Sequence, residues 1–406
     1  MTEQTTTMYS DLSISLTNTL DKSVKKNEGI FFTPPSTIMK ALKFLTPYMD
    51  DINDILEPSC GSCEFIHLLN TTFVGKNITG IEYNKTIFDS IAHFSKENIN
   101  IINHDFLTFT NPKTYNLIIG NPPYFVLKKN EVNSDYYDYF EGRPNIFILF
   151  IIKSLQMLSE NGILCFILPT SFLNSSYYNK ARKFIVKKFK ILDILPCNDD
   201  DYIETKQETI AFIVQKNKDI ESNNLFSINK NSYIIFGTQN NIQVLNSLFE
   251  NSVSLNDIDV KVSVGKVVWN QCKDILTHDD SQTLLVYSSD IKNNKLEVQS
   301  YRNPQKKNYI MKSGLNKPLL VVNRGYGNAK YCFSYCLIDG TKEYLIENHL
   351  ICINYTKEVS NEILTKFYEK IITSLQNEKT KQFVDLYFGN NAINTTELNF
   401  ILPIYL

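Results

Sequence analysis

The sequence predicts an α/β fold: a parallel sheet with helices on both faces, followed by a second domain of mixed α/β structure. Through the first half of the chain, short apolar runs alternate with amphipathic stretches, which is typical of strands joined by crossover helices. From about residue 225 this alternation stops, and Asn and Ser become dense among short apolar runs. We therefore expect two domains, residues 1–222 and 223–406, which also suits a chain of 406 residues.

Seven apolar runs predict the strands of the first domain: Asp54–Glu57, Asn77–Glu82, Ile99–Asn103, Tyr115–Gly120, Gly162–Pro169, Lys190–Leu195 and Ile210–Gln215. Helices are expected before and between them, at Thr37–Tyr48, Cys63–Asn70, Lys85–Lys96, Asn145–Leu158 and Tyr177–Phe189. Open sheets of this kind bind ligands at the carboxyl ends of their strands. The residues that follow each strand are therefore where we look for a site.

The composition is that of an ordinary soluble protein, with a formal net charge of −2 and 43% hydrophobic residues. This charge excludes a uniformly basic coat for nucleic acid but leaves room for a local basic groove. The central apolar run Ile146–Ile152 is too short to span a bilayer, and the polar N-terminus lacks the apolar core of a signal peptide. We expect a cytoplasmic protein that is neither membrane-bound nor secreted.

Eight cysteines are scattered along the chain. Cys60 and Cys63 form a C-x-x-C pair, and Cys332 and Cys336 form a C-x-x-x-C pair. Neither pair is accompanied by the second Cys pair or His pair that a zinc site requires. The cysteines are therefore expected to be free thiols, and no metal is expected.

Acidic residues follow three of the predicted strands in an order that suits a nucleotide-like ligand. Glu57 ends the first strand, and the turn after it consists of the small residues Ser59, Cys60 and Gly61, which let a ligand approach the backbone. Glu82 ends the second strand, where a carboxylate can accept hydrogen bonds from both hydroxyls of a ribose. Asp105 and Phe106 follow the third strand, where they suit the amino group and the ring of an adenine. A plain surface acid is the alternative at each position, but the shared order favours a ligand site.

The tetrapeptide Asn121-Pro122-Pro123-Tyr124 directly follows the predicted strand Tyr115–Gly120. Proline cannot continue a central strand, so the chain leaves the sheet here. An exocyclic amine has two N–H groups and a lone pair delocalised into its ring. If the Asn121 side-chain oxygen and the Pro122 carbonyl oxygen accept hydrogen bonds from both N–H groups, the nitrogen shifts toward sp³. Its lone pair then becomes available to attack a methyl donor. Tyr124 can stack on the flat substrate. A proline-rich structural turn is the alternative.

The order of these motifs resembles that of gamma-class adenine-N6 DNA methyltransferases of the type II restriction–modification kind. The resemblance covers nearly the whole chain and is closest over residues 30–215. It implies a Rossmann-like S-adenosylmethionine-dependent methyltransferase domain at 1–222 and a C-terminal DNA target-recognition domain of mixed α/β structure at 223–406. The implied reaction transfers a methyl group from S-adenosylmethionine to N6 of an adenine flipped out of double-stranded DNA.

The resemblance also implies roles for individual residues. The segment Phe32-Thr33-Pro34-Pro35 is similar to a motif that closes over the methionine part of the cofactor. The implied cofactor-binding residues are Thr33, Glu57, Ser59, Cys60, Gly61, Glu82, Tyr83, Asp105, Phe106, Asn121, Pro123 and Phe150. Asn121, Pro122 and Tyr124 are the implied catalytic residues, and Tyr202 matches the aromatic residue that sandwiches the target base opposite Tyr124. Cys63 departs from the family, which often has glycine there.

A basic stretch in the second domain predicts the contact with nucleic acid. Between Tyr301 and Lys330 there are seven basic residues and no acid, with Tyr301, Tyr309 and Tyr326 interleaved. Together with two lysines after the tetrapeptide, the expected DNA-binding residues are Lys128, Lys129, Arg302, Lys306, Lys307 and Arg324. The expected partners are double-stranded DNA and a separately encoded cognate restriction endonuclease, and the chain is expected to be a monomer.

Other functions stay open at this point. Asn-Pro-Pro-Tyr also occurs in methyltransferases that act on an RNA base amino group or on a protein glutamine amide. Those enzymes usually carry a small N-terminal substrate domain, whereas the additional mass here is C-terminal. A cytosine-C5 enzyme needs a Pro-Cys nucleophile, but Pro196-Cys197 lies far downstream of the catalytic strand. A catalytically silent DNA-specificity module is disfavoured by the intact tetrapeptide.

Overall fold

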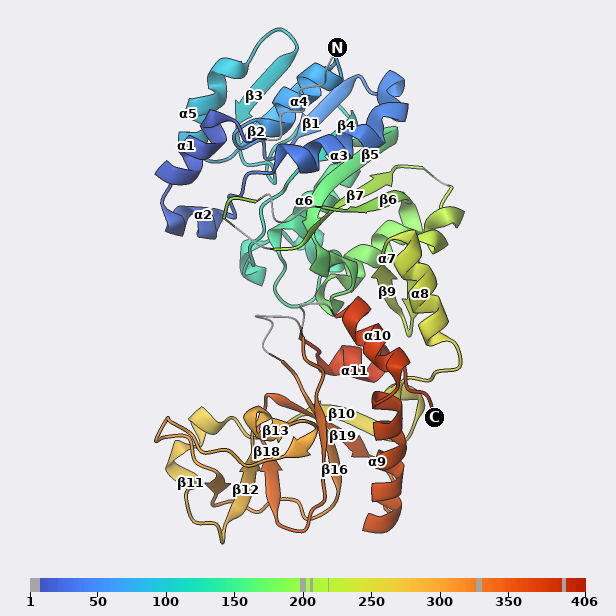
Figure 1. Ribbon diagram of the computed structural model, residues 1–406. Helices are drawn as coiled ribbons and strands as arrows, with labels where there is room; N and C mark the ends of the chain where they lie inside the picture. Colours follow the sequence, from blue (N-terminus) through green and yellow to red (C-terminus); the bar gives the residue numbers. More distant parts are fainter. Residues whose placement is uncertain (1–7, 198–201, 205–206, 218, 326–330, 389–391) are drawn as a thin grey trace. The chain divides into compact units, whose positions relative to one another are not determined.

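The computed structural model describes residues 8–197, 202–204, 207–217, 219–325, 331–388 and 392–406 (Figure 1). Its internal contacts divide the chain into two compact units. The N-terminal unit comprises Met1–Asn229 with Ile234–Ile242, and the C-terminal unit comprises Lys230–Tyr233 with Gln243–Leu406. The chain passes between the two units within residues 227–249, which form strands β8 (Ser227–Lys230) and β9 (Tyr233–Phe236) and helix α8 (Gln239–Phe249).

A seven-stranded sheet forms the centre of the N-terminal unit, in the order β3-β2-β1-β4-β5-β7-β6. Its strands are β1 (Asp54–Glu57), β2 (Asn77–Glu82), β3 (Ile99–Asn103), β4 (Tyr115–Gly120), β5 (Leu158–Pro169), β6 (Lys190–Pro196) and β7 (Thr209–Gln215). The predicted α/β class and all seven predicted strands are confirmed. The expectation of a wholly parallel sheet is wrong, because β7 runs antiparallel to both β5 and β6. β6 and β7 follow one another in the strand sequence, and antiparallel neighbours can be joined directly, whereas parallel neighbours need a crossover connection.

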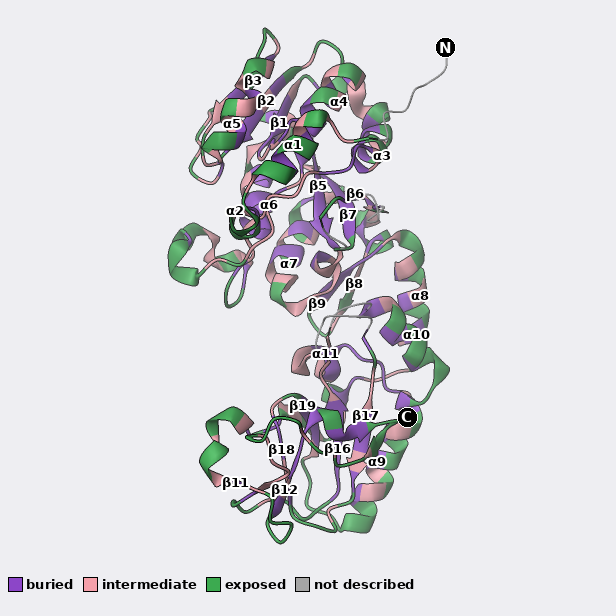
Figure 2. Ribbon diagram, turned by 60° about the vertical axis from the view of Figure 1, so that its left-hand side comes forward, coloured by how far each residue is buried: buried purple, intermediate pink, exposed green. Residues whose placement is uncertain are grey.

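Helices cover both faces of this sheet because successive strand residues point to opposite sides. In β4, Ile118 packs in one core with the helices α6 (Ile146–Met157) and α7 (Asn179–Lys188). Its neighbours Leu117 and Ile119 pack in the opposite core. That second core includes residues from α1 (Asp11–Thr19), α3 (Pro35–Leu45), α4 (Glu64–Thr72) and α5 (Lys85–Ile91). The strands are consequently buried along most of their length (Figure 2).

The strand order places a crevice at the carboxyl ends of β1 and β4. From β1 the chain proceeds to β2 and β3 on one side of the sheet, and then crosses to β4 and β5 on the other side. The connections that leave β1 and β4 therefore diverge, which is the position where open α/β sheets bind ligands. The segment after β1 begins with Pro58 and Ser59, and the segment after β4 begins with Asn121.

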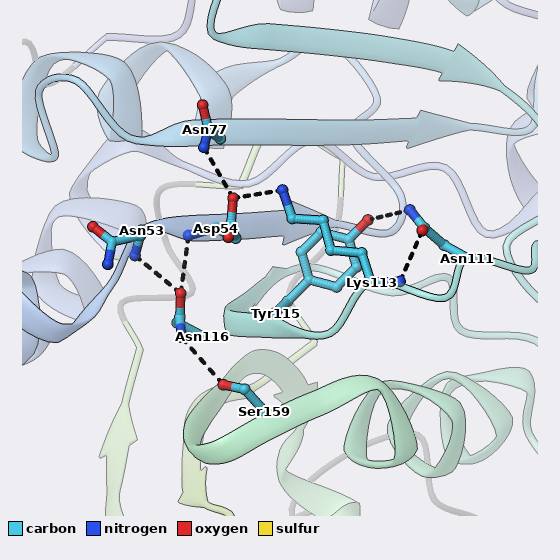
Figure 3. A network of polar contacts seen from close by, with 8 residues as sticks. All are labelled: Asn53, Asp54, Asn77, Asn111, Lys113, Tyr115, Asn116 and Ser159. Carbon is cyan, nitrogen blue, oxygen red and sulfur yellow. Dashed lines mark hydrogen bonds and ion pairs between the residues drawn. The ribbon is translucent and has the colours of Figure 1, made fainter.

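The amino ends of the same strands carry a hydrogen-bonded polar network (Figure 3). The Asn116 side-chain oxygen accepts hydrogen bonds from the backbone N–H groups of Asn53 and Asp54, both at 3.1 Å. Its amide nitrogen donates to the Ser159 hydroxyl at 3.2 Å. The Asp54 carboxylate accepts from Asn77 at 3.0 Å and pairs with Lys113 at 2.6 Å. These contacts join β1, β2, β4 and the start of β5.

The C-terminal unit has mixed α/β structure with short strands, as the sequence predicts. One antiparallel sheet has the order β10-β19-β16-β17, and a second sheet has the order β11-β15-β12-β18. The strands of this unit are β10 (Val260–Val264), β11 (Leu276–Thr277), β12 (Thr283–Val286), β13 (Ile291–Lys292), β14 (Lys295–Leu296), β15 (Tyr309–Ile310), β16 (Leu319–Asn323), β17 (Tyr335–Ile338), β18 (Tyr344–Ile346) and β19 (Leu350–Tyr355). Its helices are α9 (Asn361–Leu375), α10 (Glu378–Tyr387) and α11 (Thr395–Phe400). In the described parts of both units, no helix is long and apolar enough to cross a membrane.

Candidate cofactor and catalytic site

A cavity of about 460 Å³ lies at the carboxyl end of the large sheet, within the size range of small-molecule sites. Its walls come from the end of β2, from the segments after β1, β2, β3 and β4, and from α6. Residues 27–32, which comprise the end of helix α2 (Lys22–Glu28) and the chain after it, complete the walls. Nine of the twelve predicted cofactor residues line it: Ser59, Gly61, Glu82, Tyr83, Asp105, Phe106, Asn121, Pro123 and Phe150. The other three, Thr33, Glu57 and Cys60, are buried and adjoin lining residues in the sequence.

Glu57 is a buried carboxylate at the end of β1, with 1% of its surface exposed. Burial raises its pKa well above the ordinary value, and the nearby Cys63, Glu82 and Glu64 raise it further. Its Oε2 atom has no hydrogen-bond partner among the described residues. A buried carboxylate without a partner is costly, so this position suits a ligand that brings a cation. The ammonium group of a methionine moiety has that chemistry.

Glu82 lines the cavity at the end of β2. Its two oxygens accept hydrogen bonds from the backbone N–H groups of Gly61 at 2.8 Å and Asn84 at 2.7 Å. Burial raises its pKa to about 7, against the lowering effect of these two hydrogen bonds. Each carboxylate oxygen can accept more than one hydrogen bond, so the group can still receive two ribose hydroxyls. Glu28, which sequence analysis missed, lines the same cavity and accepts a hydrogen bond from Asn84 Nδ2 at 2.8 Å.

Aromatic side chains surround the segment after β3. Asp105 accepts a hydrogen bond from the backbone N–H of Leu107 at 2.8 Å, which holds its carboxylate in a local turn. The ring of Phe106 lies 4.9 Å from the ring of Phe150, between centroids. Tyr83 also lines the cavity and is 67% exposed. This end of the cavity offers a carboxylate beside apolar rings, which suits a purine.

The turn after β1 adopts a left-handed backbone at two positions. Gly61 has φ of +50°, and a Cβ atom there would lie 3.3 Å from the Phe32 ring. Cys63 has φ of +67° immediately before α4. This backbone conformation favours glycine, which the family often has at this position, and it predicts local strain at Cys63. The thiols of Cys60 and Cys63 are buried, and no cluster of three or more His, Cys, Asp or Glu suited to a metal is found in the described ranges.

The Asn121 side chain is held on both sides. Its Nδ2 atom donates to the Phe31 carbonyl at 3.2 Å, and its Oδ1 atom accepts from the Tyr124 hydroxyl at 2.6 Å. The same hydroxyl lies 2.7 Å from the Ile167 carbonyl. Because a hydroxyl has one hydrogen, it can donate to either of these two acceptors in turn. The Ser59 hydroxyl donates to the Asn121 main-chain carbonyl at 3.1 Å, which ties the two loops of the crevice together.

A segment before α3 covers the tetrapeptide Asn121–Tyr124, and sequence analysis largely missed this segment. This segment, residues 21–32, comprises α2 and the chain that follows it, and we call it the arm. Gly29 has φ of +66°, and a Cβ atom there would lie 2.7 Å from the backbone nitrogen of Tyr124. Five residues of the arm line the cavity although the sequence did not predict them: Asn27, Glu28, Gly29, Ile30 and Phe31. Gly29, directly after a polar helical stretch, was the signal in the sequence for a turn at this point. Only the fold shows that this turn approaches the backbone of Tyr124.

Tyr202, the predicted second stacking residue, is buried, with 9% of its surface exposed. It lines a small cavity of about 10 Å³ together with Thr17, Phe31 and Phe32. Phe31 therefore adjoins Tyr202 through this cavity and Asn121 through its carbonyl. The flanking residues 198–201 and 205–206 lie outside the described residues.

The predicted DNA-binding residues differ in whether their basic groups already contact other residues of the chain. Lys128 pairs with Glu131 at 3.3 Å, and Lys129 lies over the Tyr137 ring at 4.7 Å; both lysines are exposed. In the C-terminal unit, the Lys306 ammonium lies 4.1 Å from the Tyr287 ring centroid and 3.9 Å from that of Tyr301. Burial lowers the pKa of Lys306, although Glu347 and Asp290 oppose this.

Two of the predicted basic residues thus have partners inside the C-terminal unit, since Lys307 also donates to the Leu276 carbonyl at 2.9 Å. Arg302 is exposed and Arg324 is half-buried. The expected members Tyr326 and Lys330 of the basic stretch lie outside the described residues. Within that stretch, Arg302 is the predicted DNA-binding residue with the most exposed side chain.

Comparison with known proteins adds findings that do not depend on this geometry. Residues 16–203 match the family described as Eco57I restriction-modification methylase. The chain is 26% identical over 393 residues to the type II methyltransferase M.CvrRI of Paramecium bursaria Chlorella virus XZ-6E, covering 95% of this chain and 97% of that protein. It is 25% identical over 399 residues to the modification methylase CviBIII of Paramecium bursaria Chlorella virus NC1A, covering 95% and 96%.

A bacterial relative and a solved structure extend these similarities. The type II methyltransferase M.HincII of Haemophilus influenzae is 30% identical over 225 residues, which is 53% of this chain and 42% of that protein. The cryo-EM structure of the DrdV–DNA complex aligns with 93% of this chain and 56% of that chain, with a TM-score of 0.56 and 14% sequence identity. The last similarity shows a shared fold that extends through both units.

Proposed function

We propose that this chain is a restriction-modification methylase that transfers a methyl group from S-adenosylmethionine to N6 of an adenine in double-stranded DNA. One observation carries the proposal: Asn121 and Pro123 of the amine-binding tetrapeptide line the same cavity as the carboxylate residues Glu82 and Asp105. An amine acceptor and a nucleoside-like donor would then meet at one wall of the cavity. Bringing the two reactants together supplies a large part of the rate enhancement for such a transfer.

The residues of the cavity fit the proposed cofactor. S-adenosylmethionine, when bound, supplies an electrophilic methyl group on a positively charged sulfur. The unpartnered Oε2 atom of Glu57 would accept a hydrogen bond from the cofactor's ammonium group. Glu82 would accept from the ribose hydroxyls, and Asp105 with Phe106 would receive the adenine. The two buried carboxylates also favour a cationic ligand over an anionic nucleotide.

The tetrapeptide would orient and activate the acceptor amine. In the proposed reaction the Asn121 Oδ1 atom and the Pro122 carbonyl oxygen each accept a hydrogen bond from one N–H group of the amine. Tyr124 stacks on the base. The Tyr124 hydroxyl would first turn from Asn121 Oδ1 to the Ile167 carbonyl, which lies within hydrogen-bond distance. The exchange leaves no buried hydroxyl without an acceptor, so freeing Asn121 has a low cost. The amine loses its proton after transfer, and no basic side chain is required before attack.

Double-stranded DNA is the proposed substrate because the relatives that span nearly the whole chain are named type II methyltransferase and modification methylase. The target adenine would be flipped out of the duplex, which costs a few kcal/mol. Stacking on Tyr124 and Tyr202 would offset this by roughly 1–3 kcal/mol per aromatic face. We propose that residues 1–222 bind the cofactor and catalyse the reaction, and that residues 223–406 recognise the target sequence. A monomeric enzyme and a separately encoded endonuclease complete the proposal.

Methyl transfer from labelled S-adenosylmethionine tests the proposal, with genomic DNA, total RNA and protein extract offered in parallel. Sequencing of the product then distinguishes N6-methyladenine from methylated cytosine and reports the target site. Asn121→Ala is expected to lower kcat by at least about 10³-fold while cofactor affinity stays within about twofold, because the carboxamide acts mainly on the acceptor. Transfer to RNA or protein but not to DNA would refute the proposed substrate. Cofactor binding without transfer to any of them would favour the catalytically silent module.

A further inference from the structure

A buried lysine in the arm is paired with the segment that carries Tyr202. Lys25 is only 6% exposed, and lysines are rarely buried to that extent unless they are paired. Its ammonium lies 2.6 Å from the Thr17 carbonyl and 2.5 Å from Glu204 Oε1. Glu204 stands two residues after Tyr202 and its side chain is 29% exposed. The Lys25–Glu204 ion pair therefore anchors a partly exposed segment to a buried point on α2.

A few residues further along, the same arm contacts Asn121–Tyr124, which we call the catalytic loop. Gly29 packs closely against the Tyr124 backbone, and the Phe31 carbonyl accepts the hydrogen bond from Asn121 Nδ2. Phe31 also lines the small cavity beside Tyr202. A continuous set of contacts thus runs from Asn121 through the arm to Glu204. The described residues between β6 and β7, Tyr202–Glu204, are therefore held against the arm by an ion pair two residues from Tyr202.

We propose that Lys25 is a positioning residue for methyl transfer, and that its ion pair with Glu204 holds Tyr202 where the second face of the target base will lie. The inference rests on the proposed function and assigns a role to a residue outside the cofactor cavity. If Lys25 only stabilised the fold, its loss would weaken cofactor binding and DNA binding together. A positioning role through Tyr202 affects the DNA side alone, because the contacts of Gly29 and Phe31 with the catalytic loop remain.

Lys25→Met retains the apolar stem and removes the charge, and Glu204 can then turn toward solvent. We expect the KM for a duplex with the mapped target sequence to rise about 10-fold, and the cofactor Kd to stay within about twofold, because only the base-stacking side is misplaced. Lys26→Met is the matched control, because Lys26 is exposed on the same helix and its loss should change neither value. Lys25→Arg, which retains a positive charge, should restore most of the DNA affinity.

A double-mutant cycle with Tyr202→Ala tests whether Lys25 acts through Tyr202. The double variant Lys25→Met, Tyr202→Ala should have the same KM for DNA as Tyr202→Ala alone. Additive effects, an unchanged KM in Lys25→Met, or a parallel rise of the cofactor Kd would each overturn the inference. If Lys25→Met does not fold, Glu204→Gln tests the same pair from its more exposed side. A wild-type enzyme that binds the cofactor but methylates no DNA would refute the proposed function and this inference together.

Discussion

The two ends of strand β1 each carry a carboxylate, and the two carboxylates are in opposite situations. At the amino end, burial raises the pKa of Asp54, but hydrogen bonds from Lys113 and Asn77 outweigh it and the net pKa is lowered. At the carboxyl end, burial and the neighbouring acids raise the pKa of Glu57 well above its ordinary value. Only two residues, Ile55 and Leu56, stand between a carboxylate that is satisfied inside the protein and one that lacks a partner for Oε2 among the described residues.

The difference shows where the fold is stabilised and where it is prepared for a ligand. The amino ends of β1, β2 and β4 are joined by side chains that satisfy one another (Figure 3). The carboxyl ends hold two carboxylates with raised pKa values and a residue with left-handed backbone, Cys63. Natural proteins accept such local conflicts mainly at functional sites. Substitutions at the two ends should therefore have opposite effects on stability and binding.

Among substitutions at the two ends of β1, Glu57→Gln should change cofactor affinity the most. The substitution removes the charge that would pair with the cofactor's ammonium group, so the cofactor Kd is expected to rise about 100-fold in isothermal titration calorimetry. The same substitution relieves a buried carboxylate close to Glu82 and Glu64, so the free energy of unfolding in urea should rise. A variant that is less stable but still binds the cofactor normally would contradict the assigned role of Glu57.

Asn116→Ala tests the opposite end of the sheet. The alanine removes two acceptor bonds to the backbone of β1 and its preceding residue, and one donor bond to Ser159. We expect the free energy of unfolding to fall by about 2 kcal/mol, with the cofactor Kd unchanged. Asn116→Asp keeps the oxygen acceptor and should lose less than half as much stability. A large change in cofactor affinity would show that the two ends are not independent.

Glu82 predicts a pH dependence in which binding and stability change in opposite directions. Its pKa is raised to about 7, so the carboxylate that would accept the ribose hydroxyls becomes fully ionised only above that pH. Cofactor affinity should rise about tenfold from about pH 6 to about pH 8. Its contribution to stability is fully present below the ordinary pKa of 4.5 and is lost as pH rises through about 7. In Glu82→Gln, titration calorimetry should find a nearly flat affinity over this range.

Asp54→Asn should have the smallest effect. The ion pair with Lys113 is partly exposed, so its loss should lower the free energy of unfolding by only about 0.5 kcal/mol. Because the folded pKa of Asp54 is lowered, this contribution is present above the ordinary value of 3.8 and disappears as pH falls through the folded pKa. Urea unfolding at pH 7 and at low pH should show the difference from wild type shrinking in acid. A difference that grows in acid would contradict the lowered pKa.

Most of the N-terminal sheet could be predicted from sequence because its strands are short apolar runs separated by helical patterns. Strands β1 to β4 begin and end at the predicted residues. The orientation of β7 could not be predicted in the same way, because a buried strand has the same apolar pattern in either direction. The pairing of β7 between β5 and β6 is a property of the folded sheet.

The cavity-lining residues at strand ends were mostly predicted from the sequence, whereas most of those in the arm were missed. Glu82, Asp105 and Asn121 were placed in the cavity by their positions at strand ends. Glu28 and Phe31 were missed, because no periodicity indicates that the chain before α3 folds over the end of β4. Lys306 is the converse case: a basic stretch suggested a free charge, yet two tyrosine rings surround its ammonium.

The sequence alone determined the class of the fold and the strand-end residues that converge on one cavity, because these depend on local pattern and strand order. Tertiary structure decided which of those residues are under electrostatic strain. The raised pKa values of Glu57 and Glu82 arise from burial and from neighbours that only the fold brings close. It also decided that the arm orients Asn121 and, through Lys25, contacts the segment of Tyr202. Contacts between distant residues require the folded chain, and no local pattern encodes them.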